Sequence, residues 1–110
     1  MVFVLSGATG ANAQHLVRSV VDGLVDPVIA REAALLLEQQ DGVRMARFDV
    51  HTRNMMLRVD ASCTLNRSTL NTLLAPLGLQ VRCLRRSAGM SEPFRHVDPD
   101  QCADPLEQEK

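Results

Sequence analysis

Two kinds of hydrophobic periodicity alternate along this chain, and their order constrains the fold more than any other feature. Apolar residues recur at every second position in some segments, as in half-buried strands, and at every third or fourth position in others, as in amphipathic helices. The strand-like segments are residues 15–21, 43–50, 55–59 and 79–84, and the helical stripes cover residues 29–37 and 70–77. The order β-α-β-β-α-β predicts a ferredoxin-like α+β sandwich. We expect an antiparallel four-stranded sheet in the order 4-1-3-2, with both helices on one face.

Capping residues place the helix boundaries. Asp26 stands directly before Pro27, and an acceptor side chain followed by proline is typical of a helix N-terminus. Asn66 is expected to cap the second helix in the same way. Gly42 and Gly78 follow the two stripes and are predicted to end the helices.

The pattern divides the chain into one folded domain and two flanking segments. We expect the domain to span residues 15–86 of the 110. Residues 1–14 have two interpretations, an edge strand or the remnant of a signal peptide, and the small residues before Gln14 favour the signal peptide. That interpretation predicts a periplasmic or secreted protein, with a cytoplasmic location as the alternative. No run of about 18 apolar residues is present, so we predict no membrane span.

Charge and aromatic content narrow the classes of partner. Residues 87–110 carry six acidic residues against Arg95 and Lys110 and show no periodicity, which predicts a disordered acidic tail. Residues 1–86 carry ten Arg against seven acidic residues and are mildly basic. Aromatic residues make up 3% of the chain, with no Trp or Tyr, so stacking on bases has little material and a nucleic-acid partner is not expected.

A more specific pattern surrounds the first strand and helix. Val21-Asp22-Gly23-Leu24 ends the strand, Gly42-Val43 follows the helix, and a hairpin leads to Arg58-Val59-Asp60. Over residues 15–86 this frame resembles the heavy-metal-associated domain of copper chaperones, mercury-binding periplasmic proteins and the N-terminal modules of metal-pumping ATPases. The resemblance implies the ferredoxin-like fold and a relation to metal-ion binding and transport.

The metal ligands of that family are replaced in this sequence. On the same frame the family's Met position is Leu24, and its two Cys positions are Asp26 and Ile29. Two thiolates at a helix N-terminus chelate soft metals, and an Asp with an Ile does not. We therefore expect Asp26 to act as a helix cap, Leu24 and Ile29 to lie in the core, and the domain to be a degenerate binding or interaction module without a cofactor.

An alternative function is metal binding through residues outside the family's motif or through Asp26. Asp26 and His51 are expected at one end of the domain and supply two ligands for a metal ion such as Cu or Zn. Cys63 and Cys83 are expected at the opposite end, as an unconventional thiol site or a disulfide, which would leave Cys102 unpaired. In the other interpretation Cys83 is a small core residue, because its phase in the last strand points inward.

A third function rests on arginines of the sheet face away from the helices. Alternation places one arginine of each strand there: Arg18, Arg47, Arg58 and Arg82. Such a face suits an adaptor that docks an acidic protein partner, whereas a merely solvated face is the alternative. Val20, Met45, Met56 and Leu84 are expected on the same side, which leaves a monomer or a weak dimer open. No catalytic constellation has suitable spacing, so we do not expect an enzyme.

Overall fold

The structure, a computed structural model, describes residues 14–88 and 98–102. The predicted order of strands and helices is confirmed. The strands are β1 (Gln14–Asp22), β2 (Val43–Asp49), β3 (Asn54–Asp60) and β4 (Gln80–Ala88), and the α-helices are α2 (Pro27–Glu38) and α3 (Arg67–Leu74). Two short 3-10 helices follow, η1 (Ala75–Leu77) and η2 (Pro99–Gln101). The expected signal peptide lies outside the described residues, except for Gln14 in β1.

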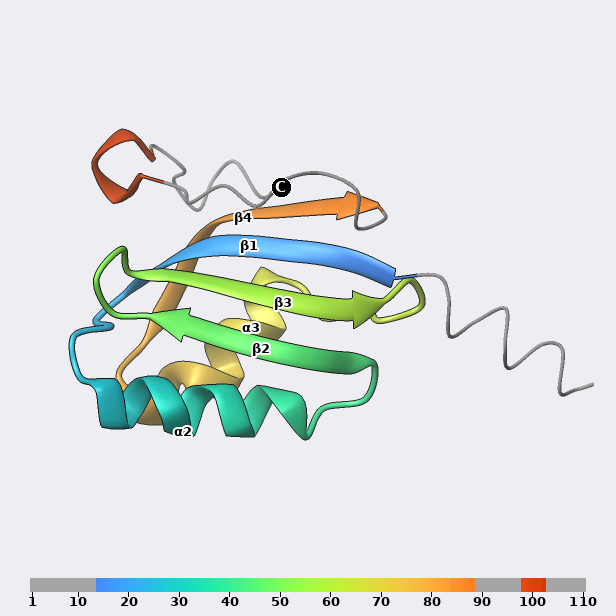
Figure 1. Cartoon of the computed structure of the whole chain (residues 1–110), viewed down its shortest axis with the longest axis horizontal. Helices are drawn as coiled ribbons and strands as arrows, with labels where there is room; N and C mark the ends of the chain where they lie inside the picture. Colours follow the sequence, from blue (N-terminus) through green and yellow to red (C-terminus); the bar gives the residue numbers. More distant parts are fainter. Residues whose placement is uncertain (1–13, 89–97, 103–110) are drawn as a thin grey trace, which may run out of the picture.

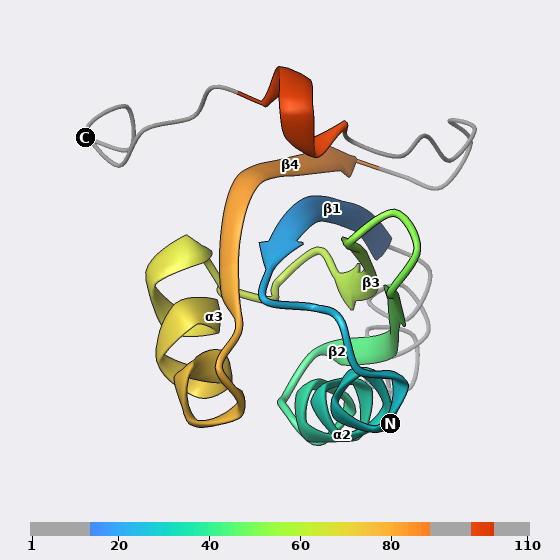
Figure 2. The same cartoon turned by 90° about the vertical axis from the view of Figure 1, so that its left-hand side faces the viewer.

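The sheet has the predicted topology. Its strands lie in the order β2-β3-β1-β4, and every neighbouring pair is antiparallel. Both helices cover one face, with α2 packed mainly on β2 and α3 on β4 (Figures 1 and 2). The molecule is therefore a ferredoxin-like α+β sandwich with a helix-covered face and an outer face.

The two helix starts form as the sequence predicts. The Asp26 carboxylate accepts a hydrogen bond from the Val28 N–H at 2.8 Å, and Pro27 occupies the first turn. Asn66 accepts from the Thr69 N–H at 2.9 Å. Each cap satisfies a backbone donor that the first turn of a helix leaves free.

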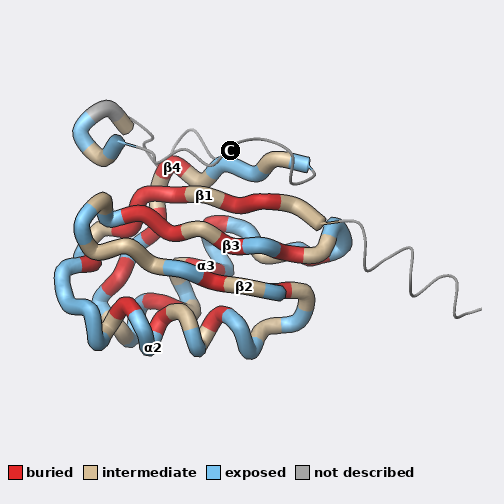
Figure 3. Tube along the Cα trace, in the orientation of Figure 1, coloured by how far each residue is buried: buried red, intermediate tan, exposed pale blue. Residues whose placement is uncertain are grey.

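The core lies between the helices and the sheet. Leu24, Leu37, Met55, Leu57 and Leu74 are among its fully buried side chains. The central strands β1 and β3 contain most of the buried residues of the sheet (Figure 3). Part of β1 is buried on both faces, because Val20 on the outer face is as inaccessible as Val21 on the helix face.

An irregularity in β4 changes the faces that its residues occupy. Arg18 pairs with Arg85 and Val20 with Arg82, so Cys83 and Leu84 together stand opposite Ser19. This is a β-bulge, and Cys83 adopts the left-handed φ of 56° there. Cys83 packs against Val20 instead of the main core, while Leu84 packs on the main core. The predicted inward Cys83 and outward Leu84 are both wrong, because strict alternation does not continue through a bulge.

The strand continues beyond the bulge. It extends to Ala88, two residues past the predicted end of the domain at residue 86. In the segment predicted to be a disordered tail, the structure describes η2 and Cys102. The rest of that prediction lies outside the described residues. Among the described helices, none is both long and apolar enough to cross a membrane.

The environment of Ser19 in the core leads to a prediction about the stability of the fold. Its side chain is fully buried, and within the described chain no hydrogen-bond partner reaches its hydroxyl. A buried hydroxyl without a partner has lost its hydration without compensation, so we expect Ser19→Ala to raise the free energy of unfolding by about 1 kcal/mol. Urea denaturation measures this. The exposed Ser62→Ala is the control, with an expected change within about 0.5 kcal/mol. A destabilised Ser19→Ala variant would contradict the prediction.

Candidate functional site

The turn between β1 and α2 lies at the same end of the molecule as the β2–β3 hairpin (Figure 1). Gly23 has a φ of 89°, and a Cβ there would collide with the Gly78 carbonyl oxygen. The Val21 N–H donates to the Arg53 carbonyl at 2.8 Å, which fixes the end of β1 to the hairpin. Close backbone packing therefore holds the turn on two sides.

Each of the three side chains that occupy the expected ligand positions has a structural role. The Asp26 carboxylate caps α2 although the residue is exposed. Leu24 is fully buried, and Ile29 packs partly buried against the main core. The interpretation of Asp26 as a cap and of Leu24 and Ile29 as core residues is thus confirmed.

His51 lies in the β2–β3 hairpin at the same end of the domain (Figure 1). The His51 side chain is exposed, and the backbone N–H of this residue donates a hydrogen bond to the Asp49 carboxylate at 3.0 Å. Among the described residues, no three or more His, Cys, Asp or Glu side chains form a group able to hold a metal ion. The loops of Asp26 and His51 share one end of the fold, but no third ligand of the described chain joins them there.

The cysteines pair differently from the Cys63–Cys83 alternative. Cys83 forms a disulfide with Cys102, with 6.2 Å between the Cα atoms. Cys63 is a free buried thiol that donates to the Asp41 carbonyl at 3.7 Å. The bulge is the physical reason, because it moves Cys83 to the outer face, whereas Cys63 belongs to the core on the helix side. The expectation that Cys102 is unpaired is wrong for the same reason.

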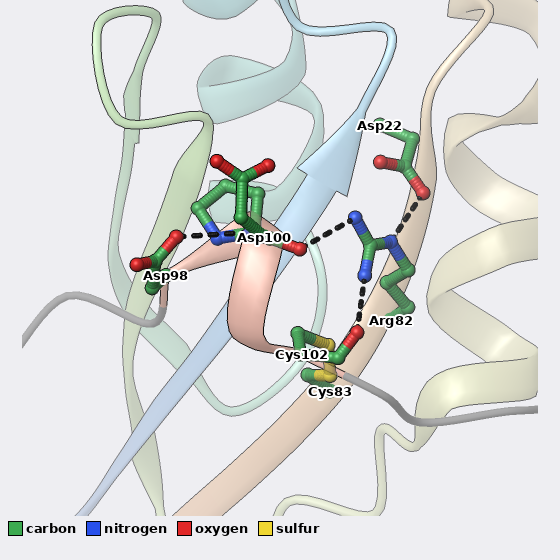
Figure 4. The surroundings of a disulfide bond; sticks show 7 residues. Asp22, Arg82, Cys83, Asp98, Asp100 and Cys102 are labelled. Atoms are coloured by element: carbon green, nitrogen blue, oxygen red, sulfur yellow. Dashed lines mark hydrogen bonds and ion pairs between the residues drawn. A yellow bond between two sulfur atoms is a disulfide. The ribbon is translucent and has the colours of Figure 1, made fainter.

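Arg82, near the start of β4, joins this strand to the segment that carries Cys102 (Figure 4). Its Nε forms an ion pair with Asp22 at 2.7 Å. Its two terminal nitrogens donate to the carbonyls of Cys102 and Pro99 at 3.0 and 3.3 Å. Together with the disulfide, these contacts place η2 over the outer side of β4 (Figure 2). Arg82 therefore does not belong to the open arginine face that alternation predicts.

Two further arginines serve the fold, and the sequence pattern gave no signal for either role. Arg44 forms a bidentate pair with Asp60, at 2.8 and 2.9 Å, and this hydrogen-bonded carboxylate raises the pKa of the guanidinium above its ordinary value. Arg86 donates to His15 Nδ1 at 2.8 Å and to the Cys63 carbonyl at 2.9 Å, which ties β4 to the loop after β3.

The remaining arginines of the outer face follow the strand register. Directly paired residues of neighbouring antiparallel strands share a face. One such row crosses all four strands and consists of Arg47, Met56, Arg18 and Arg85. The next row contains Met45, Arg58, Leu16 and Ser87. Arg18, Arg47 and Arg58 thus lie on the predicted face, and Arg85 takes the place of Arg82.

A solved structure reproduces this arrangement of strands and helices. The chain matches the CopZ metallochaperone with a TM-score of 0.53 and 18% sequence identity, over 60% of this chain and 97% of that one. The two share a fold. At this identity the likeness concerns the ferredoxin-like architecture alone. No protein-family model matches the sequence, and no curated protein matches it significantly.

Proposed function

We propose that this chain is a heavy-metal-associated-type module that has lost the dithiolate and serves as a binding or interaction module instead of a metal carrier. One observation supports this above all. The side chain at the first expected cysteine position, Asp26, is used as the cap of α2. A carboxylate in that role and the partly buried alkyl group of Ile29 do not form a soft chelate.

The fold likeness to CopZ supports the relation to metal-handling proteins but not the retention of a metal. The rival proposal, a metal site at Cys63 and Cys83, has less support, because Cys83 is in a disulfide and Cys63 is buried. We propose a binding role in preference to a catalytic one. The Cys83–Cys102 disulfide supports an oxidising compartment, the periplasm or the cell exterior.

Metal titration followed by NMR tests the proposal. With Zn(II), and with Cu(I) supplied as its acetonitrile complex without oxygen, we expect no shifts confined to residues 23–30 and 51. The reason is that Asp26 and His51 provide too few ligands to hold either ion against water. Saturable shifts at those residues would overturn the proposal in favour of a retained site. Shifts centred on Cys63 and Cys83 would support the unconventional thiol site instead.

A further inference from the structure

The outer face of the sheet carries exposed arginines that form no ion pair with another described residue. We propose that the two rows around Arg47, Arg58 and Arg85 bind an acidic segment of a partner protein. This inference goes beyond the proposed loss of the dithiolate and does not depend on it, because the face lies on the sheet and not at the turn before α2.

Apart from Arg18, the arginines of the strands fall into two groups according to their hydrogen bonds. Arg44, Arg82 and Arg86 each bond a carboxylate or backbone carbonyls. In contrast, Arg47, Arg58 and Arg85 are exposed, and no acidic side chain of the described chain forms an ion pair with them. The first group stabilises loops and strand ends, so its conformation is already determined. The second group is available to an external anion.

The register places positively charged side chains next to one another on this face. Arg85 stands directly opposite Arg18, and like charges in this position destabilise a strand pair. Two acidic residues near the face are already engaged. Asp22 pairs with Arg82, and Asp49 accepts hydrogen bonds from the His51 N–H and the Thr52 hydroxyl. An anionic partner would bring negative charge to a face on which neighbouring strands carry arginines side by side.

Apolar side chains between the arginines favour a protein segment over a nucleic acid. Met45 and Met56 are half-buried in the two rows, and Met and Arg are both enriched in protein interfaces. A single-stranded nucleic acid would need stacking surfaces, but the chain has no Trp or Tyr, and Phe48 packs against the main core. The planar guanidinium fork also matches a carboxylate in two hydrogen bonds.

The size and limits of the face suit an extended segment. Arg47 on β2 and Arg85 on β4 are three strand spacings apart, about 14 Å between their backbone positions. An extended peptide covers that distance in about four residues. Two acidic residues about four positions apart in the peptide could therefore contact Arg47 and Arg85 at the same time. At one end the face is closed by Cys102, which packs over Val20.

Binding of fluorescein-labelled polyglutamate to the full-length oxidised protein tests the proposal. We expect its NMR shifts to fall on β1 to β4 at the two rows, and Arg47→Gln/Arg85→Gln to weaken binding about tenfold. The matched control is Arg31→Gln/Arg53→Gln, which removes two exposed arginines elsewhere and is expected to change affinity by less than about twofold. All four substituted side chains are exposed, so the amide spectra are expected to keep the native fold.

Three results would overturn the proposal. Equal weakening by both double variants would mean that polyglutamate responds to net charge alone. Tighter binding of a DNA duplex than of polyglutamate, on the same face and at the same salt concentration, would identify a nucleic-acid surface. Concentration-dependent shifts of the two rows without any ligand would identify a second copy of this chain as the occupant. A change of metal binding at the turn would bear on the proposed function and not on this face.

Discussion

Replacing both Asp26 and Ile29 by cysteine is expected to create a soft-metal site at the start of α2. Asp26 is the N-cap of α2, Ile29 lies three residues later in its first turn, and the N-terminal end of a helix lowers the pKa of a cysteine thiol. Two such thiolates favour Cu(I) over harder metals. We expect the affinity for Cu(I) to rise by at least about a thousandfold over the native sequence.

Competition with a chromophoric Cu(I) chelator measures this change. Both the cysteine variant and its control, Asp26→Ser/Ile29→Ser, belong in a Cys83→Ala/Cys102→Ala background, so that reductant frees no further thiol pair. Serine at position 26 can still cap the helix. The control therefore avoids the destabilisation of about 1 kcal/mol that loss of the cap would cause relative to the native protein. Equal Cu(I) affinity of the cysteine and serine variants would show that the turn does not have the geometry of the resembled family.

Removal of the Cys83–Cys102 disulfide is expected to lower the free energy of unfolding by about 3 kcal/mol. The bond joins residues separated by 19 positions, and such a cross-link restricts the unfolded chain. It also holds Cys102 against Val20 on the outer face. Urea denaturation of Cys83→Ala/Cys102→Ala, beside the native protein, measures the loss.

Reductant provides the control for the disulfide. It is expected to lower the urea midpoint of the native protein towards that of the double variant and to leave the variant unchanged. In the variant, amide exchange at Val20 is expected to accelerate more than at Leu57, because Leu57 lies in the main core on the helix side. Identical midpoints for the native protein with and without reductant would contradict the prediction.

The fold was predictable because local signals agreed with one another. Hydrophobic period, capping residues and the short connections all specified the same element order, and this order admits few sheet topologies. Asp26 shows the strength of such signals. Its identity and the proline after it indicated a helix cap, and the structure shows that hydrogen bond. The burial of Leu24 was predicted from the same segment of sequence, and the structure shows it.

The errors have a common cause in β4. The sequence there contains no glycine to indicate a bulge, yet Cys83 adopts a positive φ and shares one opposing residue with Leu84. Regular alternation through the bulge assigns Cys83 to the helix face, pairs it with Cys63 and misses Arg85 on the outer face. Arg82 does lie on the outer face, but its contacts with Asp22 and with the segment of Cys102 were not predictable from alternation. The partners of Arg44 and Arg86 depend on contacts between distant segments, which periodicity does not encode.

The extra residue in β4 also determines what a small deletion would do to this protein. Loss of a single codon at Cys83 or Leu84 would restore regular alternation and leave the number of strands unchanged. If Leu84 were lost, Cys83 would turn toward the helices and the two bonded sulfurs would fall on opposite sides of the sheet, while a loss at Cys83 would remove one sulfur outright. We therefore expect a one-residue deletion at either of these positions to abolish the covalent cross-link and to leave the order of the strands unchanged.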